Sequence, residues 1–562
     1  MVRGAEADAG RGHAQGIRLD RHDRPPRPRR CGQGAAMIRI AVLSDPHLHD
    51  ARLGRAAGEA PFVRSLADSL HSTRIFNESE AAFRAALDAV AAEGIRLCII
   101  AGDLTDDGQP ANWQAVSDLL RDYTRRHGIR FFATPGNHDQ WSMTGKPLAK
   151  NFVDPTGLVR HQVGEGLPRA NGAQLCPGMR MVGYDETLPF AGHFGYCPQP
   201  SDLHWETPFG TSPDMTDRRA RITVEGGESA LISDMSYLVE PVEGLWLLSI
   251  DANVYLPNAD GGYDDCSKEG WNATVRHKPY LLDWIRDVAR RAAAGNKRLV
   301  AFSHYPVVDI FRGLTAALET LPGSRAGARR MPTPDVVAAI AATGIPLHFS
   351  GHWHVDAIAA ADGLVNVAVP STVAYPAGWK CLEIGSGGMD ISDRAVSDAP
   401  RFDAWFARYA AEADRTGQDG SILAVADYRQ FLDRHFRAVV LERRLPEDWP
   451  PRMQAMVETL RLPEIADLLS LAQAGLPDIA LVDIFVDWYR LREAGGGTAA
   501  GVSKERRSLY ATLARGCVDR EDPPGSDAAI LVVFLRTLGL LLTGDDAKRR
   551  SLDRLKEAFV PC

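Results

Sequence analysis

The sequence predicts an α/β protein with a separate all-helical C-terminal domain. Between residue 38 and about residue 392, short apolar runs alternate with helical patterns, which is typical of proteins built from strand–helix units. After about residue 393 the apolar residues recur at helical spacing, with Pro and Gly between the segments. The chain has 562 residues, more than one hydrophobic core usually serves, which also favours at least two folding units.

The predicted strands are β-branched or aromatic-rich runs bounded by Gly, Asp or Pro. They cover residues 38–44, 96–101, 129–134, 245–250, 298–303 and 345–350. Between them, residues 77–92 predict a helix with Asn77 as its N-cap, and residues 279–294 predict another that starts at a Pro and ends before Gly295. This alternation predicts a layered core of strands and helices.

Residues 140–244 interrupt the alternation. They are rich in Gly, Pro, Trp and His and are too long for a passive connection, so we expect an insertion that caps one edge of the sheet. The predicted organisation is therefore a first domain over residues 37–393, which includes this insertion, and a helical domain over residues 394–562. Residues 1–36 contain PPRPRR and no apolar segment, which predicts a disordered or non-native leader, with a basic interaction arm as the alternative.

The net charge, the number of cysteines and the longest apolar stretch limit the classes of partner that we expect the protein to bind. The net charge is −8, from 64 Lys and Arg against 72 Asp and Glu, which disfavours long nucleic acid and anionic membranes as partners. Eight Cys are too few for a disulfide framework, so we expect reduced thiols and a cytoplasmic location. The longest apolar stretch, residues 528–543, contains Arg536 and is shorter than the roughly 20 residues of a membrane span, which predicts a buried helix and no membrane partner.

Polar side chains follow five of the predicted strands, at the point where each strand ends. The motifs are Ser44-Asp45-Pro46-His47, Gly102-Asp103, Gly136-Asn137-His138-Asp139, Ser303-His304 and Gly351-His352-Trp353-His354. Open α/β sheets bind their ligands just beyond the carboxyl ends of the strands. We therefore expect these side chains to converge on one crevice.

The residue types in these motifs indicate metal ions. Asp, His and Asn without Cys suit Mn²⁺ or Fe²⁺, with Zn²⁺ as an alternative. The candidate ligands are Asp45, His47, Asp103, Asn137, His304, His352 and His354, too many for one ion but enough for two that share a carboxylate. Two ions about 3.5–4 Å apart can hold a phosphate and activate a bridging water. His138 is placed to donate a proton to the leaving oxygen.

The ordered motifs DxH, GD, GNHD, H and GHxH, at Asp45–His47, Gly102–Asp103, Gly136–Asp139, His304 and Gly351–His354, resemble those of the calcineurin-like metallophosphoesterase superfamily. The resemblance covers roughly residues 38–390 and implies a four-layer αββα sandwich as the catalytic domain. It also implies that one ion is held by Asp45, His47, Asp103 and His354, and the other by Asp103, Asn137, His304 and His352. GNHD and the helical C-terminal segment resemble, more narrowly, bacterial class III cyclic nucleotide phosphodiesterases.

We therefore predict a metal-dependent phosphoric ester hydrolase, a phosphodiesterase in which a metal-bridging hydroxide attacks phosphorus without a covalent enzyme intermediate. The expected partner is a small-molecule phosphoester, with 3′,5′-cyclic nucleotides as the leading substrates. A phosphomonoesterase or nuclease of the same fold is the alternative enzyme. A different class of function is a metal-binding scaffold that recruits partners through the helical domain.

Three positions have two interpretations. Asp139, which we count with His138 as a candidate catalytic residue, either orients His138 or caps the next turn. Trp353, between two candidate ligands, either stacks on a base or packs in the protein. His49 follows the first motif closely, and we expect it on a surface loop rather than in the metal site.

Overall fold

The fold is described from a computed structural model, which covers residues 37–51, 63–169, 172–223, 229–321, 331–386, 388–472, 475–497 and 500–558. The predicted leader, residues 1–36, lies outside the described residues.

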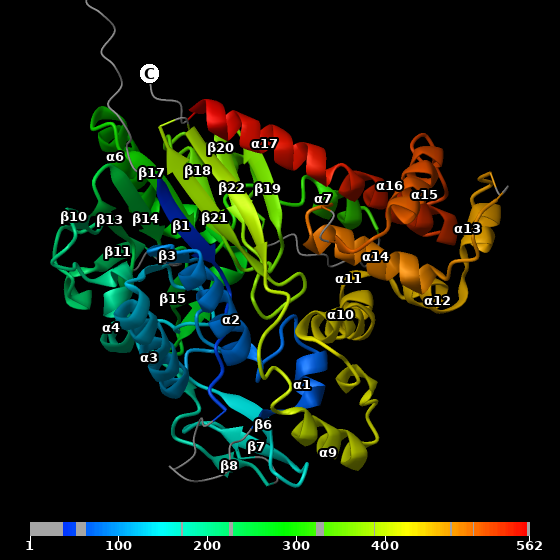
Figure 1. The fold of residues 1–562 in the computed structure, drawn as a ribbon, viewed down its shortest axis with the longest axis horizontal. Coiled ribbons are helices and arrows are strands. Elements are labelled where there is room, and N and C mark those ends of the chain that lie inside the picture. Colours follow the sequence, from blue (N-terminus) through cyan, green and yellow to red (C-terminus); the bar gives the residue numbers. More distant parts are fainter. Residues whose placement is uncertain are drawn as a thin grey trace, which may run out of the picture.

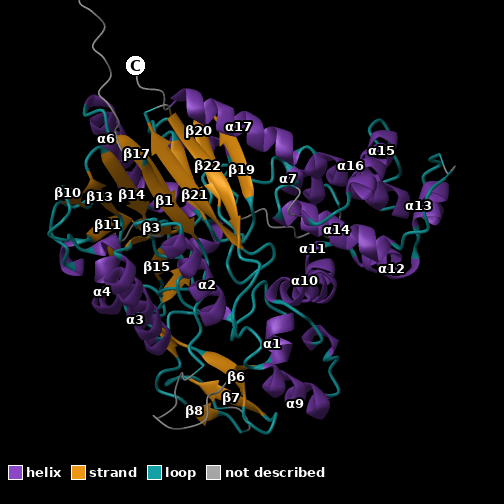
Figure 2. Ribbon diagram, in the orientation of Figure 1, coloured by secondary structure: helices purple, strands orange, loops and turns teal. Residues whose placement is uncertain are grey.

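Two β-sheets form the centre of the molecule (Figure 2). The five-stranded sheet has the order β22 (Gly388–Ala395), β21 (Gly378–Gly385), β1 (Ile38–Leu43), β3 (Leu97–Ile100) and β4 (Arg130–Ala133). The seven-stranded sheet has the order β10 (His204–Glu206), β13 (Tyr237–Val242), β14 (Leu245–Ile250), β17 (Arg298–Ser303), β18 (Leu347–Ser350), β20 (Leu364–Ala368) and β19 (Ala357–Ala361). Strands β1, β3 and β4 are parallel, as are β14, β17, β18 and β20, so the carboxyl ends within each set lie at one edge.

The two sheets share one hydrophobic cluster. Ile99 of β3 belongs to it together with Leu247 of β14 and Phe349 of β18. The next residue of β14, Leu248, lies in a different cluster with residues of α6 (Pro279–Ala294) and α8 (Pro334–Ala341). Because alternate side chains of a strand point to opposite faces, β14 is buried on both faces. The mixed α/β fold is confirmed, and the four-layer order stays a prediction.

The predicted strands are confirmed within two residues at each end, and the predicted helix 279–294 is α6. The predicted helix 77–92 is α2 (Ser79–Ala92), but Asn77 is not its N-cap. The Asn77 Oδ1 atom accepts a hydrogen bond from the Arg64 amide at 2.8 Å, and its Nδ2 atom donates to the Tyr409 hydroxyl at 2.5 Å. Asn77 thus joins distant segments instead of capping its own helix.

The segment 140–244 is more than a cap. It contains β5 (Lys146–Pro147), β9 (Arg180–Met181), α4 (Tyr184–Ala191) and the hairpin β11 (Arg219–Thr223) and β12 (Ser229–Ser233). Its strands β6 (Ala149–Val153), β7 (Val159–Val163) and β8 (Gln174–Leu175) form a small sheet with β2 (Val63–Arg64), at the bottom of Figure 1. However, β10 and β13 of the same segment are strands of the seven-stranded sheet.

The remaining helices of the first part of the chain are three short ones of five to seven residues and one of 18 residues. They are α1 (Leu66–Leu70), α3 (Pro110–His127), α5 (Trp271–His277) and α7 (Leu314–Glu319), and two-residue to three-residue strands include β15 (Tyr255–Pro257) and β16 (Tyr263–Asp265). Of these helices only α3 is long; it ends at Gly128, whose φ of 65° is the left-handed conformation common after a helix.

The described residues beyond β22 contain only helices as regular structure. They form α9 (Phe406–Thr416), α10 (Tyr428–Val439), α11 (Leu445–Asp448), α12 (Pro451–Thr459), α13 (Leu462–Leu468), α14 (Leu481–Glu493), α15 (Lys504–Gly516), α16 (Asp527–Leu542) and α17 (Gly544–Ala558). Trp449, Trp488 and Phe534 belong to a second hydrophobic cluster, which also includes Leu314 of α7 and Ala357 of β19. The helical prediction is confirmed over this region.

The separation of the helical region is not confirmed. Tyr409 of α9 and Phe431 of α10 belong to the same hydrophobic cluster as the two sheets. Helix α17 returns to the sheets and lies along β19 and β22, as Figure 1 shows. The first and last helices of the region therefore pack on the α/β part, whereas the middle ones pack mainly on each other.

The apolar stretch 528–543 forms α16, in which Leu531, Phe534 and Leu538 are buried, as predicted. No single helix of the described part is long and apolar enough to cross a membrane. Judged by length and composition alone, α16 and residues 546–553 would together be long and apolar enough for a span, and the two segments are bent by 41° relative to each other.

Candidate metal centre

The polar residues of the five motifs lie where the sequence places them, directly beyond the carboxyl ends of β1, β3, β4, β17 and β18. They fall into two groups whose ligand atoms lie within 4.8 Å of one another: Asp45, His47 and His354, and Asp103, His304 and His352. Six of the seven predicted ligands thus form the two expected groups, and the seventh, Asn137, is found beside the second.

The first group is built on Asp45 and two imidazoles. The Nε2 atoms of His47 and His354 are 3.2 Å apart, and they lie 3.8 Å and 3.4 Å from the Asp45 Oδ1 atom. Asp45 and His47 are essentially without solvent exposure, and His354 is buried. Three donor atoms with lone pairs therefore converge on one small volume inside the protein.

The second group is built on Asp103. The His304 Nε2 atom lies 3.1 Å from the Asp103 Oδ2 atom, 3.1 Å from the Asn137 Oδ1 atom and 3.2 Å from the His352 Nδ1 atom. The other ring nitrogen of His304, Nδ1, is 3.0 Å from the Ala101 carbonyl oxygen. A proton on Nδ1 would bind that carbonyl and leave Nε2 free to coordinate a cation.

Asp103 connects the two groups. Its Oδ2 atom lies 3.5 Å from His47 Nε2 and 3.1 Å from His304 Nε2. Its Oδ1 atom accepts a hydrogen bond of 2.8 Å from the His138 amide, which fixes the carboxylate plane. One carboxylate oxygen is therefore within reach of both imidazole sets, the arrangement expected of a ligand shared by two ions.

The backbone at the site is strained. Five of the seven candidate ligands have positive φ: Asp45 (49°), His47 (42°), Asp103 (52°), His352 (71°) and His354 (58°). Residues other than Gly rarely adopt this conformation, and each instance costs on the order of 1–3 kcal/mol. Such strain persists where the surrounding structure enforces it, which is characteristic of functional sites.

Two glycines of the motifs are required by close approach. A Cβ atom on Gly136 would overlap the Asp103 carboxylate, and a Cβ atom on Gly351 would overlap Ser44 and the Asp45 carboxylate. Both glycines allow the backbone to pass directly behind a candidate ligand. The glycines of the GNHD and GHxH motifs therefore serve the packing of the site.

The chemistry of the donor set fits divalent cations. Burial holds the pKa of His47 well below its ordinary value, so this imidazole is neutral, the form that binds metal. Burial alone would lower the pKa of His304, but the Asp103 carboxylate raises it to about 9, so a cation that binds here would displace a proton from His304. The buried His47 Nδ1 atom has no hydrogen-bond partner among the described residues. These features fit ions held by buried carboxylates and imidazoles without thiolates.

His138 is held by residues that the sequence analysis missed. Its Nδ1 atom contacts the Asp107 carboxylate, whose other oxygen contacts Lys150 of β6. Burial alone would raise the pKa of Asp107, but Lys150 and His138 lower it well below its usual value, so the carboxylate is ionised. An ionised acceptor on Nδ1 leaves Nε2 of His138 as the atom available to a substrate.

A second carboxylate stabilises this arrangement. Asp106 is fully buried and binds three cations, Arg64 at 2.9 Å, Arg74 at 2.7 Å and Lys150 at 3.0 Å. Arg74 also lies 3.3 Å from His138 Nδ1. The only sequence signal for this cluster is the pair of acids in Gly102-Asp103-Leu104-Thr105-Asp106-Asp107, because its three cations come from distant positions.

The contacts of Asp139 are those of a turn cap, one of the two roles considered for it. Its Oδ1 atom accepts hydrogen bonds from the Thr105 amide at 3.0 Å and the Thr105 hydroxyl at 3.1 Å, and its Oδ2 atom accepts one from the Gly136 amide at 2.9 Å. Burial and the nearby Asp103 charge raise the pKa of Asp139 to about 7. Asp139 therefore acts on the turn that carries Asn137 and His138, and Asp107 contacts the imidazole.

The structure also bears on the expectations for His49 and Trp353. His49 is buried rather than on a surface loop, with its Nδ1 atom 3.7 Å from Asp106 Oδ2, so that expectation was wrong. Trp353 packs edge-on against Phe311, at 5.1 Å between ring centroids, and contacts the hydrophobic cluster of the C-terminal helices. These contacts favour the packing role of Trp353.

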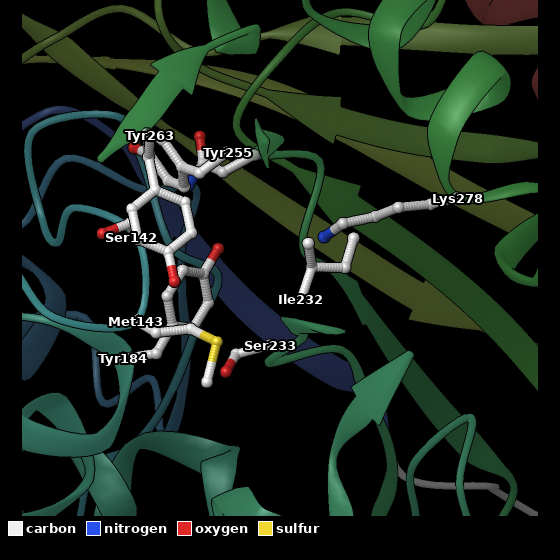
Figure 3. Close-up of a pocket in the computed structure, with 9 residues that line it drawn as sticks. Ser142, Met143, Tyr184, Ile232, Ser233, Tyr255, Tyr263 and Lys278 are labelled. Atoms are coloured by element: carbon white, nitrogen blue, oxygen red, sulfur yellow. The ribbon is translucent and has the colours of Figure 1, made fainter. Parts of the chain in front are cut away.

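A small cavity lies between residues of the segment 140–244 and residues 253–278, and no candidate metal ligand lines it (Figure 3). It has a volume of about 10 Å³, room for one water, and is lined by Ser142, Met143, Tyr184, Ile232, Ser233, Asn253, Tyr255, Tyr263 and Lys278. The Lys278 Nζ atom lies 3.2 Å from Asp234 Oδ2 and 3.0 Å from the Asp251 carbonyl oxygen. The cavity is thus part of a buried polar cluster and too small for a substrate.

Comparison with known proteins gives a family match for part of the chain. Residues 38–214 match the family described as calcineurin-like phosphoesterase. No curated protein matches the chain. Similar solved structures include a dimetal phosphatase from Danio rerio, 11% identical, with a TM-score of 0.29 and coverage of 64% of this chain and 96% of that one.

Two further solved structures are similar at the same level. A putative 5′-nucleotidase from Staphylococcus aureus in complex with alpha-ketoglutarate is 13% identical, with a TM-score of 0.31 and coverage of 67% of this chain and 58% of that one. Phosphopantetheinyl hydrolase from Mycobacterium tuberculosis is 12% identical, with a TM-score of 0.24 and coverage of 59% of this chain and 89% of that one.

The matched segment contains three of the five motifs, those at Asp45–His47, Gly102–Asp103 and Gly136–Asp139. The remaining two, at His304 and at Gly351–His354, lie beyond it in sequence, but the structure brings them to the same place. Residues 38–214 are thus similar in sequence to the calcineurin-like phosphoesterases.

Proposed function

We propose that the chain is a phosphoester hydrolase that uses two divalent metal ions. The observation that carries the proposal is the position of Asp103, whose Oδ2 atom lies within 3.5 Å of an imidazole nitrogen from each ligand group. Two divalent ions, when bound there, supply positive charge that holds a phosphoryl group and activates water. The calcineurin-like family match over residues 38–214 supports the same chemistry.

The ligand sets follow from the distances. Asp45, His47 and His354 with Asp103 would hold one ion, and Asp103, Asn137, His304 and His352 would hold the other. Oxygen and imidazole donors without sulfur favour Mn²⁺ or Fe²⁺, and Zn²⁺ binds the same donors.

His138 serves as the proton donor to the leaving oxygen. Asp107 accepts from its Nδ1 atom, and its ring lies edge-on to the His47 ring, with 5.0 Å between centroids. The imidazole is therefore beside the first ligand group, partly exposed, with Nε2 not taken by Asp107. A donor at this position assists the departure of an alkoxide leaving group.

Phosphodiesters are the proposed substrates, with 3′,5′-cyclic nucleotides first among them. The GNHD sequence of the third motif supports this through its resemblance to class III cyclic nucleotide phosphodiesterases. The net charge of −8 also disfavours long nucleic acid and leaves small phosphoesters as the partners. We propose the cytoplasm as the location, as the sparse cysteines favour.

The test is a comparison of two chromogenic esters with the Mn²⁺-loaded full chain. We expect bis(p-nitrophenyl) phosphate to be hydrolysed with a higher kcat/KM than p-nitrophenyl phosphate, and Asn137→Ala to lower both rates at least a hundredfold. Preference for the monoester would overturn the diesterase proposal and leave the hydrolase. If Mn²⁺, Fe²⁺ and Zn²⁺ forms all fail on both esters while the ions bind, the protein is a metal-binding scaffold.

A further inference from the structure

A large cavity lies at the outer edge of the seven-stranded sheet. It has a volume of about 760 Å³ and is lined by residues of α7, α8, β19 and α17 and by the loop that precedes α7. No candidate metal ligand contributes to its wall. The volume falls in the range of about 300–1,000 Å³ that is typical of small-molecule sites.

Most of the inner wall is apolar. Val308, Met331, Val337 and Ile358 are buried and line the cavity. Strand β19, the edge of the sheet, contributes the small side chains of residues 359–361, so the space between the sheet and α17 is not filled by side chains. A wall of this kind favours the apolar body of an organic molecule.

Two guanidinium groups also line the cavity. Neither Arg312 nor Arg550 makes a side-chain hydrogen bond or ion pair with a residue that the structure describes. Burial lowers the pKa of Arg312, the charge of Asp309 opposes this shift, and the charge of Arg550 adds to it. Asp309 is the nearby carboxylate, but it accepts hydrogen bonds from the Phe311 amide at 2.9 Å and the Gly313 amide at 2.6 Å. Arg312 is half-buried and has a φ of 54°, so a strained backbone holds this cation at the cavity.

A half-buried cation beside a like charge is unfavourable unless an anion joins them. Two unpaired guanidinium groups above an apolar wall therefore fit a ligand with an acidic group and an apolar body. The carboxylates of Asp309, Glu319 and Asp362, which also line the cavity, oppose a highly charged ligand and favour a single acidic group.

We propose that this cavity binds a small organic anion, an apolar or aromatic body that carries one acidic group. The site is distinct from the metal centre, and the proposal does not depend on the phosphoester hydrolase assignment. Arg312 and Arg550 bind the acidic group, and the wall around Ile358 binds the body.

The probe is 1-anilinonaphthalene-8-sulfonate, which combines an apolar body with one sulfonate, measured by fluorescence and by isothermal titration calorimetry on the full chain. We expect a single tight site. The double variant Arg312→Gln/Arg550→Gln weakens the binding at least tenfold, and so does Ala316→Trp, which fills the cavity from an exposed position on α7. The control is Arg549→Gln, because Arg549 pairs with Asp546 and does not line the cavity.

The neutral analogue N-phenyl-1-naphthylamine separates the contributions of charge and apolar surface. We expect it to bind at least tenfold more weakly than the sulfonate to the unmodified chain. Equal affinity for the two compounds, or full binding by the double variant, would overturn the anion site. Full binding by Ala316→Trp would show that the probe binds outside the cavity and would overturn its location. Melting temperatures of all variants identify any loss that comes from unfolding.

Discussion

The Asp103 carboxylate lies within reach of both ligand groups of the candidate metal centre. Because its Oδ2 atom lies within 3.5 Å of both His47 and His304, Asp103→Asn removes the shared negative charge from both ligand groups. We expect the variant to bind at most one ion per chain and to lose at least a hundredfold in kcat/KM. Metal content by inductively coupled plasma mass spectrometry is the measurement. Asp118→Asn, on the exposed face of α3, is the matched control, and two ions in Asp103→Asn would refute the shared ligand.

Asp107 acts on the reaction through His138. Asp107→Asn removes the ionised acceptor from Nδ1 and leaves the candidate ligands in place, so metal content should not change. We expect kcat to fall about tenfold to a hundredfold, and to fall more for an alkyl leaving group than for p-nitrophenolate, which departs without a proton. The measurement is kcat across a series of phosphodiesters whose leaving groups differ in pKa. An equal loss for every leaving group would argue against a role in positioning the proton donor.

At the scale of elements, α10 is joined to α1 by a buried histidine. The His435 Nε2 atom lies 2.8 Å from the Ser69 carbonyl oxygen, and burial lowers the pKa of His435 from 6.5 to about 4. The unfolded chain therefore takes up this proton at a higher pH than the folded chain. The stabilisation is complete above pH 6.5 and is lost as the pH falls toward 4, a change of about 3 kcal/mol in the free energy of unfolding.

The check on this linkage is the melting temperature of the parent chain and of His435→Gln between pH 7 and pH 4. We expect the melting temperature of the parent to fall more steeply over this interval than that of the variant. Other buried histidines such as His348 titrate in both proteins, so their contribution cancels in the comparison. Parallel curves would contradict the assignment of this pH dependence to His435.

At the scale of the whole molecule, one ion cluster joins both sheets and the last helix. Lys380 of β21 binds Asp356, which precedes β19, at 2.5 Å and also binds Asp393 of β22. Lys548 of α17 binds Asp393 at 2.7 Å and Asp356 at 3.3 Å. Segments far apart in the sequence are therefore held together by four charges, two of each sign.

The two lysines of this cluster should differ in their effect on stability. Lys380 is fully buried, so Lys380→Met leaves the buried Asp356 carboxylate short of a partner, and we expect a loss of about 3 kcal/mol in the free energy of unfolding. Lys548 keeps 21% of its side chain exposed, and for Lys548→Met we expect about 1 kcal/mol. Urea denaturation followed by circular dichroism measures both. A larger loss from Lys548→Met would show that α17 carries the cluster.

The spacing of apolar residues predicted the strands and most helices, because the buried face of an element determines where apolar residues recur along the chain. The runs at residues 245–250 and 298–303 are mostly apolar, since β14 and β17 are covered on both faces, and their predicted bounds agree with the structure. Helix α17 was missed because its sequence, GDDAKRRSLDRLKEA, has few apolar residues and its contacts with the sheets include the ion pairs of Lys548. A helix that is held in place partly by ion pairs needs fewer apolar residues, so its sequence shows little hydrophobic periodicity.

The candidate ligands could be predicted for a different reason: each follows a strand in a short motif, so local sequence shows both the residue type and its position. The support for His138 could not be predicted in this way. Asp106 and Asp107 are adjacent acids with different partners, and Lys150 and Arg74 reach them from a small sheet strand and a loop. Which of the two acids contacts the imidazole depends on tertiary packing alone.

The left-handed backbone at the ligand residues determines how an inactive reference protein is best made. At His352, with a φ of 71°, Ala would lose the ligand and keep an unfavourable backbone, so lower activity could not be told apart from a disturbed loop. Asn tolerates this conformation better than other side chains that have a Cβ atom. Asn substitutions at His352 and His354 should therefore remove the imidazole ligands and weaken metal binding while the loop keeps its course, which makes them better inactive references than Ala substitutions.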